Sequence, residues 1–260
     1  GSMFRGCRSL ISFDFAALGA PNLEDASDFF RMCTWLDEVS FADARTGRLV
    51  TTERMFYGCR NLARITGADS LQAGRIENLS GMFRFCARLP QLDCALWDTA
   101  SVREANFLFS GCLSLSQLDV SMWRMPRLQT ARGMFSSTPI ERVDLTGWGA
   151  HELTDTSYMF DSCASLREVV FGAMDLSGVL RAQSSTVAPS WNASRMKGGA
   201  CRTSETPRGC SSDARAWNMS PAVSLIWRWR RTPIGLARAA RRPCRNAGGS
   251  IRASRRSRAL

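Results

Sequence analysis

The chain has 260 residues, 45% of them hydrophobic, and a formal net charge of +11 at pH 7. The charge is unevenly placed, because residues 1–180 hold 17 basic and 21 acidic side chains whereas residues 181–260 hold 17 basic and 2 acidic ones. This split excludes a uniformly basic, nucleic-acid-binding domain, since the pI of about 9.8 belongs to the C-terminal part alone. No signal peptide opens the chain, and its longest uncharged apolar stretch, near residues 222–227, is shorter than the roughly 20 residues that span a bilayer.

A phenylalanine, usually preceded by methionine, recurs along the first 180 residues. The seven copies, 26, 26, 27, 26, 26 and 25 residues apart, are Phe4, Phe30, Phe56, Phe83, Phe109, Phe135 and Phe160. We number the surrounding segments as units 1 to 7 and count positions from this anchor phenylalanine. Seven copies in phase indicate a repeat protein.

Other apolar residues keep fixed distances from the anchor. A cysteine follows at position +3 in six units, and unit 6 has Thr138 there; the six are Cys7, Cys33, Cys59, Cys86, Cys112 and Cys163. Leucine or isoleucine recurs at about +6, another apolar residue at about +9, and a large one often at about +14, as at Trp97 and Trp123. The pattern predicts one hydrophobic core that runs through all units.

The spacing also predicts local structure. Leu118 and Val120 alternate as the inward residues of a short strand do. Residues 154–163 carry Ser, Thr and Asp ahead of a Met-Phe-x-x-Cys run, which predicts a capped short helix with one buried face. Neither element can bury its apolar side alone, so stacking would give parallel strands on one face and short helices on the opposite face.

Units 4 and 5 show the repeat most fully. Unit 4 contains Met82-Phe83, Cys86, Leu89, Leu92-Asp93, Trp97-Asp98-Thr99 and Ser101-Val102. Unit 5 contains Leu108-Phe109, Cys112, Leu115, Leu118-Asp119-Val120-Ser121 and Trp123. These residues resemble the BspA-type leucine-rich repeats of bacterial and protist surface proteins. The resemblance covers about residues 1–180, although units 2 and 3 lack much of the middle block.

The resemblance implies an α/β repeat solenoid, a right-handed leucine-rich-repeat-like coil. It also implies a part of a longer secreted or surface protein that binds host or matrix proteins. Extracellular or cell-surface localisation is therefore expected from the family.

The cysteines and the single histidine invite catalytic or metal hypotheses. Equivalent cysteines on stacked units point the same way and not at one another, which disfavours disulfides, and buried cysteine behaves as a small hydrophobic residue. A 26-residue step with one histidine, His151, does not supply a zinc site. No nucleophile motif or phosphate-binding glycine loop is present. We predict no catalytic residue, no cofactor, no metal and no small-molecule substrate.

Four aspartates follow the predicted strands directly and should face outward: Asp14, Asp93, Asp119 and Asp144. Stacked units would place such carboxylates about 4.8 Å apart, which is unfavourable unless they are hydrogen-bonded or bind cations. One interpretation is that they are solvated or cap the following turn. The other is that they line a concave ligand-binding face with three residues two places earlier, Gln91, Gln117 and Arg142.

The repeat stops near residue 180. The eighth anchor would fall at position 186, where the chain has Thr186, and residues 181–260 are rich in Arg, Ser, Ala, Gly and Pro. We expect this part to be largely disordered. It is either translated in a shifted reading frame or a genuine basic tail, whose Trp227-Arg228-Trp229 run suits an anionic membrane or nucleic acid.

Three hypotheses follow. The repeats form a non-catalytic protein-binding or adhesion scaffold, or the arginine-rich tail binds nucleic acid or an anionic membrane, or the chain is a truncated gene fragment without a role of its own. Only the first uses residues 1–180.

Overall fold

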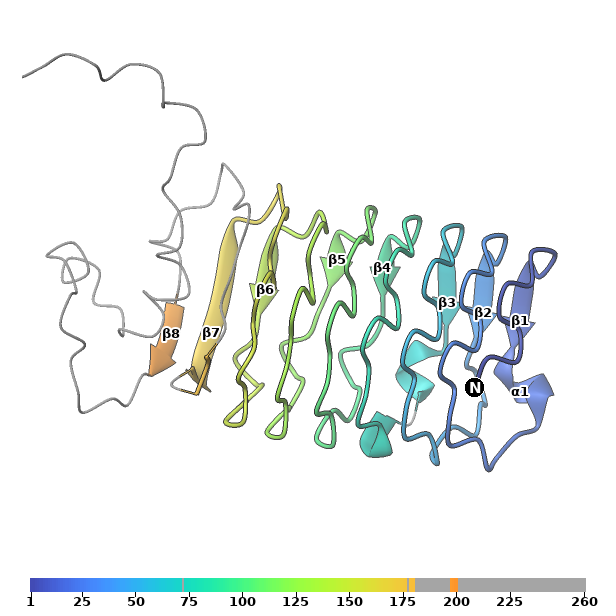
Figure 1. Ribbon diagram of the computed structural model, residues 1–260, viewed down its shortest axis with the longest axis horizontal. Helices are drawn as coiled ribbons and strands as arrows, with labels where there is room; N and C mark the ends of the chain where they lie inside the picture. The colour runs from blue at the N-terminus through green and yellow to red at the C-terminus, as the bar shows by residue number, and fades with distance from the viewer. Residues whose placement is uncertain (72, 177, 181–196, 201–260) are drawn as a thin grey trace, which may run out of the picture. The chain divides into compact units, whose positions relative to one another are not determined.

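The computed structural model describes residues 1–71, 73–176, 178–180 and 197–200. All of them belong to the first of the chain's two compact units, residues 1–230, and each repeat unit forms one circuit of the chain that stacks on the previous one (Figure 1). The predictions for residues 181–196 and 201–260 concern residues outside this description.

Short parallel strands form one side of the stack (Figure 1). They are β1 (Ser12–Asp14), β2 (Glu38–Ser40), β3 (Arg64–Thr66), β4 (Gln91–Leu92), β5 (Gln117–Leu118), β6 (Arg142–Asp144), β7 (Glu168–Asp175) and β8 (Lys197–Ala200). The sheets are β1-β2-β3, β4-β5 and β6-β7-β8, all with parallel pairing. The sequence analysis predicted parallel strands in the repeats but not β8.

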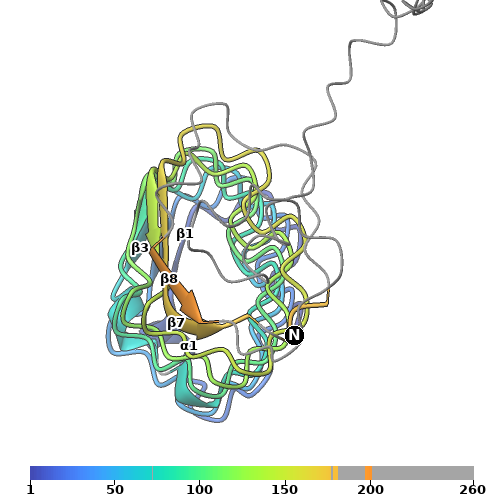
Figure 2. The same ribbon diagram turned by 90° about the vertical axis from the view of Figure 1, so that its left-hand side faces the viewer.

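The segments around the anchor phenylalanines form the opposite side of the stack, as the view along its axis shows (Figure 2). Here the sequence-based prediction of short helices is wrong, because these segments consist of consecutive tight turns. The helical elements are few and lie elsewhere: α1 (Phe15–Leu18), η1 (Ala68–Ser70) and η2 (Ala73–Arg75).

Hydrogen bonds between units explain why these segments are not helical. The amides of Asp28, Phe30 and Met32 donate to carbonyl oxygens of the next unit at 2.9, 2.8 and 2.7 Å. Every second amide therefore points along the stack, whereas a helix would use them internally. A second ladder of single parallel bridges runs beside these turns, through Asp25, Thr51, Asn78, Glu104, Thr130 and Asp155.

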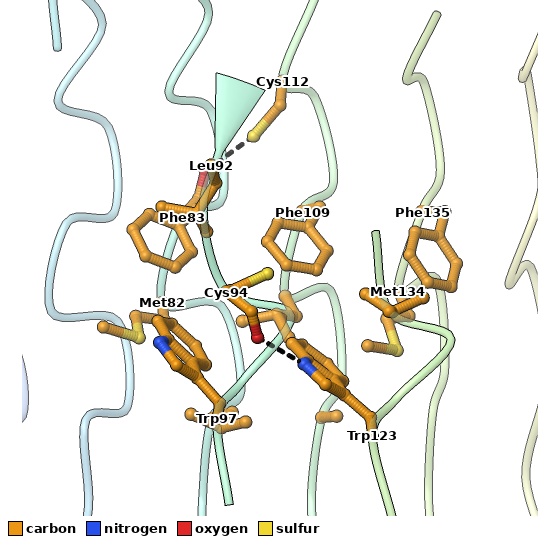
Figure 3. Close-up of a cluster of buried hydrophobic side chains, with 14 of the residues drawn as sticks. Met82, Phe83, Leu92, Cys94, Trp97, Phe109, Cys112, Trp123, Met134 and Phe135 are labelled. Atoms are coloured by element: carbon orange, nitrogen blue, oxygen red, sulfur yellow. Dashed lines mark hydrogen bonds between the residues drawn. The ribbon is translucent and has the colours of Figure 1, made fainter. Parts of the chain in front are cut away.

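The core is built from columns of identical side chains (Figure 3). Consecutive anchor phenylalanines stack with ring centroids 5.4 to 5.9 Å apart. Trp97, Trp123 and Trp148 form a parallel column with centroid distances of 5.9 and 6.3 Å. In unit 2, which lacks the tryptophan, Phe41 is buried and stacks on Phe15 at 4.6 Å. Stacked aromatic pairs contribute about 0.5–1.5 kcal/mol each beyond their buried area.

The repeat cysteines lie in the same core. All are buried except Cys7, which is half-buried, and the seven cysteines of the described residues are free thiols. Each buried repeat thiol donates to the carbonyl oxygen of the preceding anchor phenylalanine, as from Cys112 to Phe83 at 3.0 Å (Figure 3). The structural interpretation of these cysteines is confirmed, and they act as hydrogen-bond donors between units as well as hydrophobic filler.

Candidate functional site

The strand side presents its outward residues in register. In the first sheet, Ser12 is aligned with Glu38 and Glu38 with Arg64. In the other two sheets, Gln91 is aligned with Gln117, and Arg142 with Glu168. We call the outward residues of β1 to β7, together with Asp93 and Asp119 directly after β4 and β5, the strand face. It places the predicted residues Gln91, Gln117 and Arg142 at equivalent positions of consecutive units.

Ion pairs connect neighbouring strands of this face. Arg64 NH2 lies 2.9 Å from Glu38 Oε2, and Arg142 Nε lies 3.1 Å from Glu168 Oε2. Arg142 also contacts Asp144, with 2.9 Å between NH2 and Oδ2. Such solvent-exposed pairs contribute about 0–1 kcal/mol each, so they shape the surface more than they stabilise the fold. The charges at each end of the strand face are thus largely paired, and the amides of Gln91 and Gln117 lie between them.

The predicted aspartate column is continuous over only three units. Asp93, Asp119 and Asp144 occupy equivalent positions in units 4 to 6. Asp14 is separated from them, because its aligned partners are Ser40 and Thr66. The structure therefore brings together three of the four aspartates.

These carboxylates serve the turns that follow the strands. Asp14 Oδ1 accepts from the amide of Ala16 at 2.9 Å and caps α1, and Asp119 Oδ1 accepts from the amide of Ser121 at the same distance. Asp144 Oδ1 accepts from the amide of Thr146 at 3.0 Å. Hydrogen bonds from the amide and the hydroxyl of Ser121, with Arg142 nearby, hold the pKa of Asp119 below its usual value. The turn-capping interpretation applies to these three residues.

The opposite side carries a feature that sequence reasoning missed. We call the residues from three before to two after each anchor phenylalanine the turn face. Across units 2 to 7 it holds an alternating column of arginines and aromatic rings, formed by Arg31, Tyr57, Arg84, Phe107, Arg132 and Tyr158. We call it the arginine–aromatic column.

Tyr57 and Phe107 each have a neighbour in the column on both sides. A guanidinium group from the unit before and another from the unit after approach each of these rings. The guanidinium carbons of Arg31 and Arg84 lie 4.9 and 5.9 Å from the ring centroid of Tyr57. Those of Arg84 and Arg132 lie 4.3 and 5.9 Å from the centroid of Phe107. Arg132 continues to Tyr158 at 5.4 Å. These distances are within the range of cation–π attraction.

The local fold of the turns creates this column. In each unit the amide at position +1 donates to the carbonyl at position −2, as from Tyr57 to Arg54 at 3.0 Å and from Ser110 to Phe107 at 3.2 Å. This bond places the side chains of positions −2 and +1 side by side. The residue that contributes to the column is therefore at position +1 in units 2 to 4 and at position −2 or −3 in units 5 to 7. A comparison of the units at one repeat position at a time does not reveal the column.

Glycines make room for the rings of the turn face. Backbone φ is positive at positions −2 and +2 of every unit, where glycine alternates with larger residues. A Cβ atom on Gly133 would lie 2.4 Å from Cε1 of Phe107, and one on Gly111 would lie 2.5 Å from Cδ1 of Phe85. The aromatic rings therefore rest directly on the backbone of the next unit, which fixes them as half-exposed platforms.

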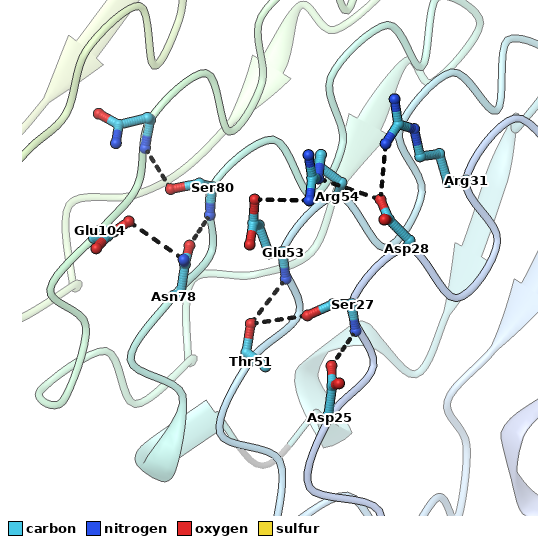
Figure 4. Close-up of polar contacts among 11 residues, drawn as sticks. Asp25, Ser27, Asp28, Arg31, Thr51, Glu53, Arg54, Asn78, Ser80 and Glu104 are labelled. Atoms are coloured by element: carbon cyan, nitrogen blue, oxygen red, sulfur yellow. Dashed lines mark hydrogen bonds and ion pairs between the residues drawn. The ribbon is translucent and has the colours of Figure 1, made fainter. Parts of the chain in front are cut away.

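In units 2 and 3 of the turn face, acidic groups pair with arginines (Figure 4). Asp28 Oδ1 lies 3.4 Å from Arg31 NH1 and 3.2 Å from Arg54 Nε, and Glu53 Oε1 lies 3.2 Å from Arg54 NH2. For Arg84 and Arg132 no carboxylate of the described residues lies within ion-pair distance. The charges of these two arginines are thus not paired within the described residues.

Other chemistry is sparse in the described part of the chain. A hollow lined by Asp43, Arg45, Asp69, Arg75 and Asp98 lies where units 2 to 4 leave their strands. Within the ranges that the structure describes, no three His, Cys, Asp or Glu side chains are grouped so that they could hold a metal ion. The same ranges contain no helix with the length and apolar character needed to cross a membrane.

Two comparisons with known proteins found a match to part of the chain. Residues 50–171, which include most of units 3 to 7, match the model of a family described as DUF285, a Mycoplasma protein of unknown function. No curated protein matches the chain. A crystal structure of a leucine-rich repeat protein from Bacteroides ovatus is similar at 12% identity and a TM-score of 0.24, over 67% of this chain and 64% of that one. The chain thus spans less than two thirds of that protein's length.

Proposed function

We propose that this chain is a non-catalytic protein-binding scaffold, a leucine-rich-repeat-like solenoid of the BspA type within a secreted or surface-located protein. The observation that carries the proposal is the strand face. Its polar side chains come from seven units, are aligned within each of three sheets, and lie on a core in which the tryptophan column and every anchor phenylalanine except Phe4 are buried. Six steps of about 4.8 Å give this face a length of about 29 Å. That length suits the roughly 800 Å² that each partner of a stable protein complex buries.

The chemistry of the strand face favours a protein ligand over a small molecule. Small-molecule sites are concave and mostly apolar, with few polar groups. Here the exposed residues are carboxylates, amides and guanidiniums in rows, which suits many hydrogen bonds to an extended surface. Asp93, Asp119 and Asp144 form the most regular part of the face. We propose that Asp93 and Asp119 contact the ligand through oxygen atoms not used by the turns, and that Asp144 does so together with Arg142, which pairs with its second oxygen.

The test removes charge while retaining the caps. In the triple variant D93N/D119N/D144N each side chain keeps an oxygen, so positions 119 and 144 can still accept from the backbone amide. Binding to immobilised fibronectin and type I collagen, as representative matrix proteins, is measured by biolayer interferometry. We expect the triple variant to lose about tenfold or more in affinity, because each lost charge-assisted hydrogen bond costs about 1.5–3 kcal/mol.

A matched control carries the same three changes elsewhere. Asp25, Asp98 and Asp155 accept from the amide two residues on, as Asp119 and Asp144 do, and they lie off the strand face. The variant D25N/D98N/D155N should bind like the unmodified chain. Equal losses in both variants, or no binding of the unmodified chain to either matrix protein, would contradict the proposal.

A further inference from the structure

The arginine–aromatic column is a surface separate from the strand face. The guanidinium carbon of Arg84 lies over the rings of Tyr57, Phe85 and Phe107, and that of Arg132 lies over Phe107 and Tyr158, so the terminal N–H groups of both side chains are the ones left for a ligand. Nε of Arg84 is buried and has no hydrogen-bond partner among the described residues. Arginine held in this way is preorganised for bidentate bonds to carboxylates.

The spacing of the two arginines indicates the shape of the ligand. They lie in units 4 and 6, two steps apart along the stack, which corresponds to about 9.6 Å. A polyproline II segment repeats every three residues and advances about 9.3 Å in that distance. Acidic side chains at every third residue of such a segment would meet the arginines in turn.

We propose that the arginine–aromatic column binds an extended acidic peptide in polyproline II conformation, with Asp or Glu at every third position, lying along the stack. Charge complementarity supports this occupant, because Arg84 and Arg132 have no carboxylate partner in the described part of the chain whereas Arg31 and Arg54 already have theirs. Phe85 lies beside Arg84, whose guanidinium carbon is 4.9 Å from its ring centroid, and its exposed part adds apolar surface for the proline rings. This binding does not require the strand face to function.

The geometry favours a peptide over single-stranded nucleic acid. Nucleic-acid surfaces of this composition leave aromatic faces open so that bases can stack on them. In this column the rings of Tyr57 and Phe107 each have a guanidinium from both neighbouring units. The ring faces are therefore taken, and the guanidinium edges are what a ligand meets.

The experiment uses three fluorescent probes and the full chain. The first is a peptide of four Glu-Pro-Pro repeats. The second has the same composition with its four glutamates in one block, and the third is oligouridylate. Fluorescence anisotropy should show the repeat peptide binding about tenfold more tightly than the block peptide, because only the repeat places carboxylates at the spacing of Arg84 and Arg132. Equal binding of the two peptides, or tighter binding of oligouridylate, overturns the proposal.

Two double variants locate the binding. R84Q/R132Q should weaken binding of the repeat peptide about tenfold or more, whereas R60Q/R88Q, which removes two exposed arginines outside the column, should change it by less than about threefold. Equal losses would show non-specific charge attraction and refute the assignment. If R84Q/R132Q does not fold, R84K/R132K retains charge and stem but loses the planar fork. It should still weaken binding clearly, and unchanged binding would refute the proposal.

Discussion

The indole Nε1 of Trp123 donates a 2.7 Å hydrogen bond to the carbonyl oxygen of Cys94 in the preceding unit (Figure 3). Trp97 and Trp148 make equivalent bonds to Ala68 and Val120, at 2.7 and 3.1 Å. Each indole therefore fills the core of its own unit and satisfies a buried carbonyl of the unit before it. This bond couples the stability of neighbouring units, as nearest-neighbour contacts do in repeat proteins.

Replacing Trp123 by phenylalanine should destabilise the protein by about 2–4 kcal/mol. The change leaves the carbonyl of Cys94 without its donor, which costs about 1–3 kcal/mol, and removes part of a fully buried ring system. Urea denaturation followed by circular dichroism measures the effect. Trp35→Phe is the control, because Trp35 is 63% exposed and its replacement should change stability by about 0.5 kcal/mol or less. Similar effects of the two changes would refute the role of the bond.

The sequence predicted the columns of the core because a stacked repeat places equal positions on top of one another. Phe30 and Phe56, 26 residues apart, are stacked with an interplanar angle of 7°. Gln91 and Gln117 are aligned for the same reason. The constant repeat period is therefore sufficient to predict contacts between equivalent residues of neighbouring units.

Features that depend on backbone shape could not be predicted in this way. Met159, Phe160 and Cys163 are all buried, as the helical interpretation expected, but two tight turns bury the same residues as a helix would. The turns also bring Phe107 of one unit between Arg84 and Arg132 of its neighbours, although these three residues occupy different repeat positions. The candidate site was therefore predicted on the strand face only.

Burial should protect the Cys112 thiol from alkylation. Its side chain is fully buried, and desolvation raises its pKa to about 12, so the reactive thiolate is scarce at neutral pH. Peptide-resolved mass spectrometry after brief iodoacetamide treatment should find Cys7, which is half-buried, modified long before Cys112. Unfolding in urea should abolish the difference. Equal rates in the folded protein would contradict the buried position of this column.

The charge of Asp119 should stabilise the fold at neutral pH but not in acid. Because its folded-state pKa is lowered below 3.8, chiefly by hydrogen bonds from Ser121, the ionised form favours the folded state. That contribution is present above the unfolded pKa and is lost as the pH falls through the folded pKa. Asp119→Asn keeps the accepting oxygen, so its melting temperature should lie below that of the unmodified chain at about pH 7, and the gap should close towards about pH 3. A gap that stays constant or widens in acid would contradict this cause.

The contact between Gly133 and Phe107 should appear as a coupling free energy. Gly133→Ala forces a Cβ atom to 2.4 Å from the Phe107 ring and places alanine at φ +58°, and both effects destabilise the fold. Gly149→Ala is the matched control, because its φ is +56° and its nearest neighbour, Nε2 of His151, is 3.9 Å away. Gly149→Ala should lower the free energy of unfolding only by the backbone strain of about 1–2 kcal/mol, and Gly133→Ala should lower it clearly more.

A double-mutant cycle with Phe107→Ala separates the clash from the strain. Removing the ring leaves space for the new methyl group, so the cost of Gly133→Ala in the Phe107→Ala background should fall towards that of Gly149→Ala. The resulting interaction energy should be about 0.5–3 kcal/mol, whereas the pair Gly149→Ala and Phe107→Ala should be additive within about 0.5 kcal/mol. Additivity of the Gly133 pair would show that the ring of Phe107 does not rest on the next unit, and the arginine–aromatic column would lose its support.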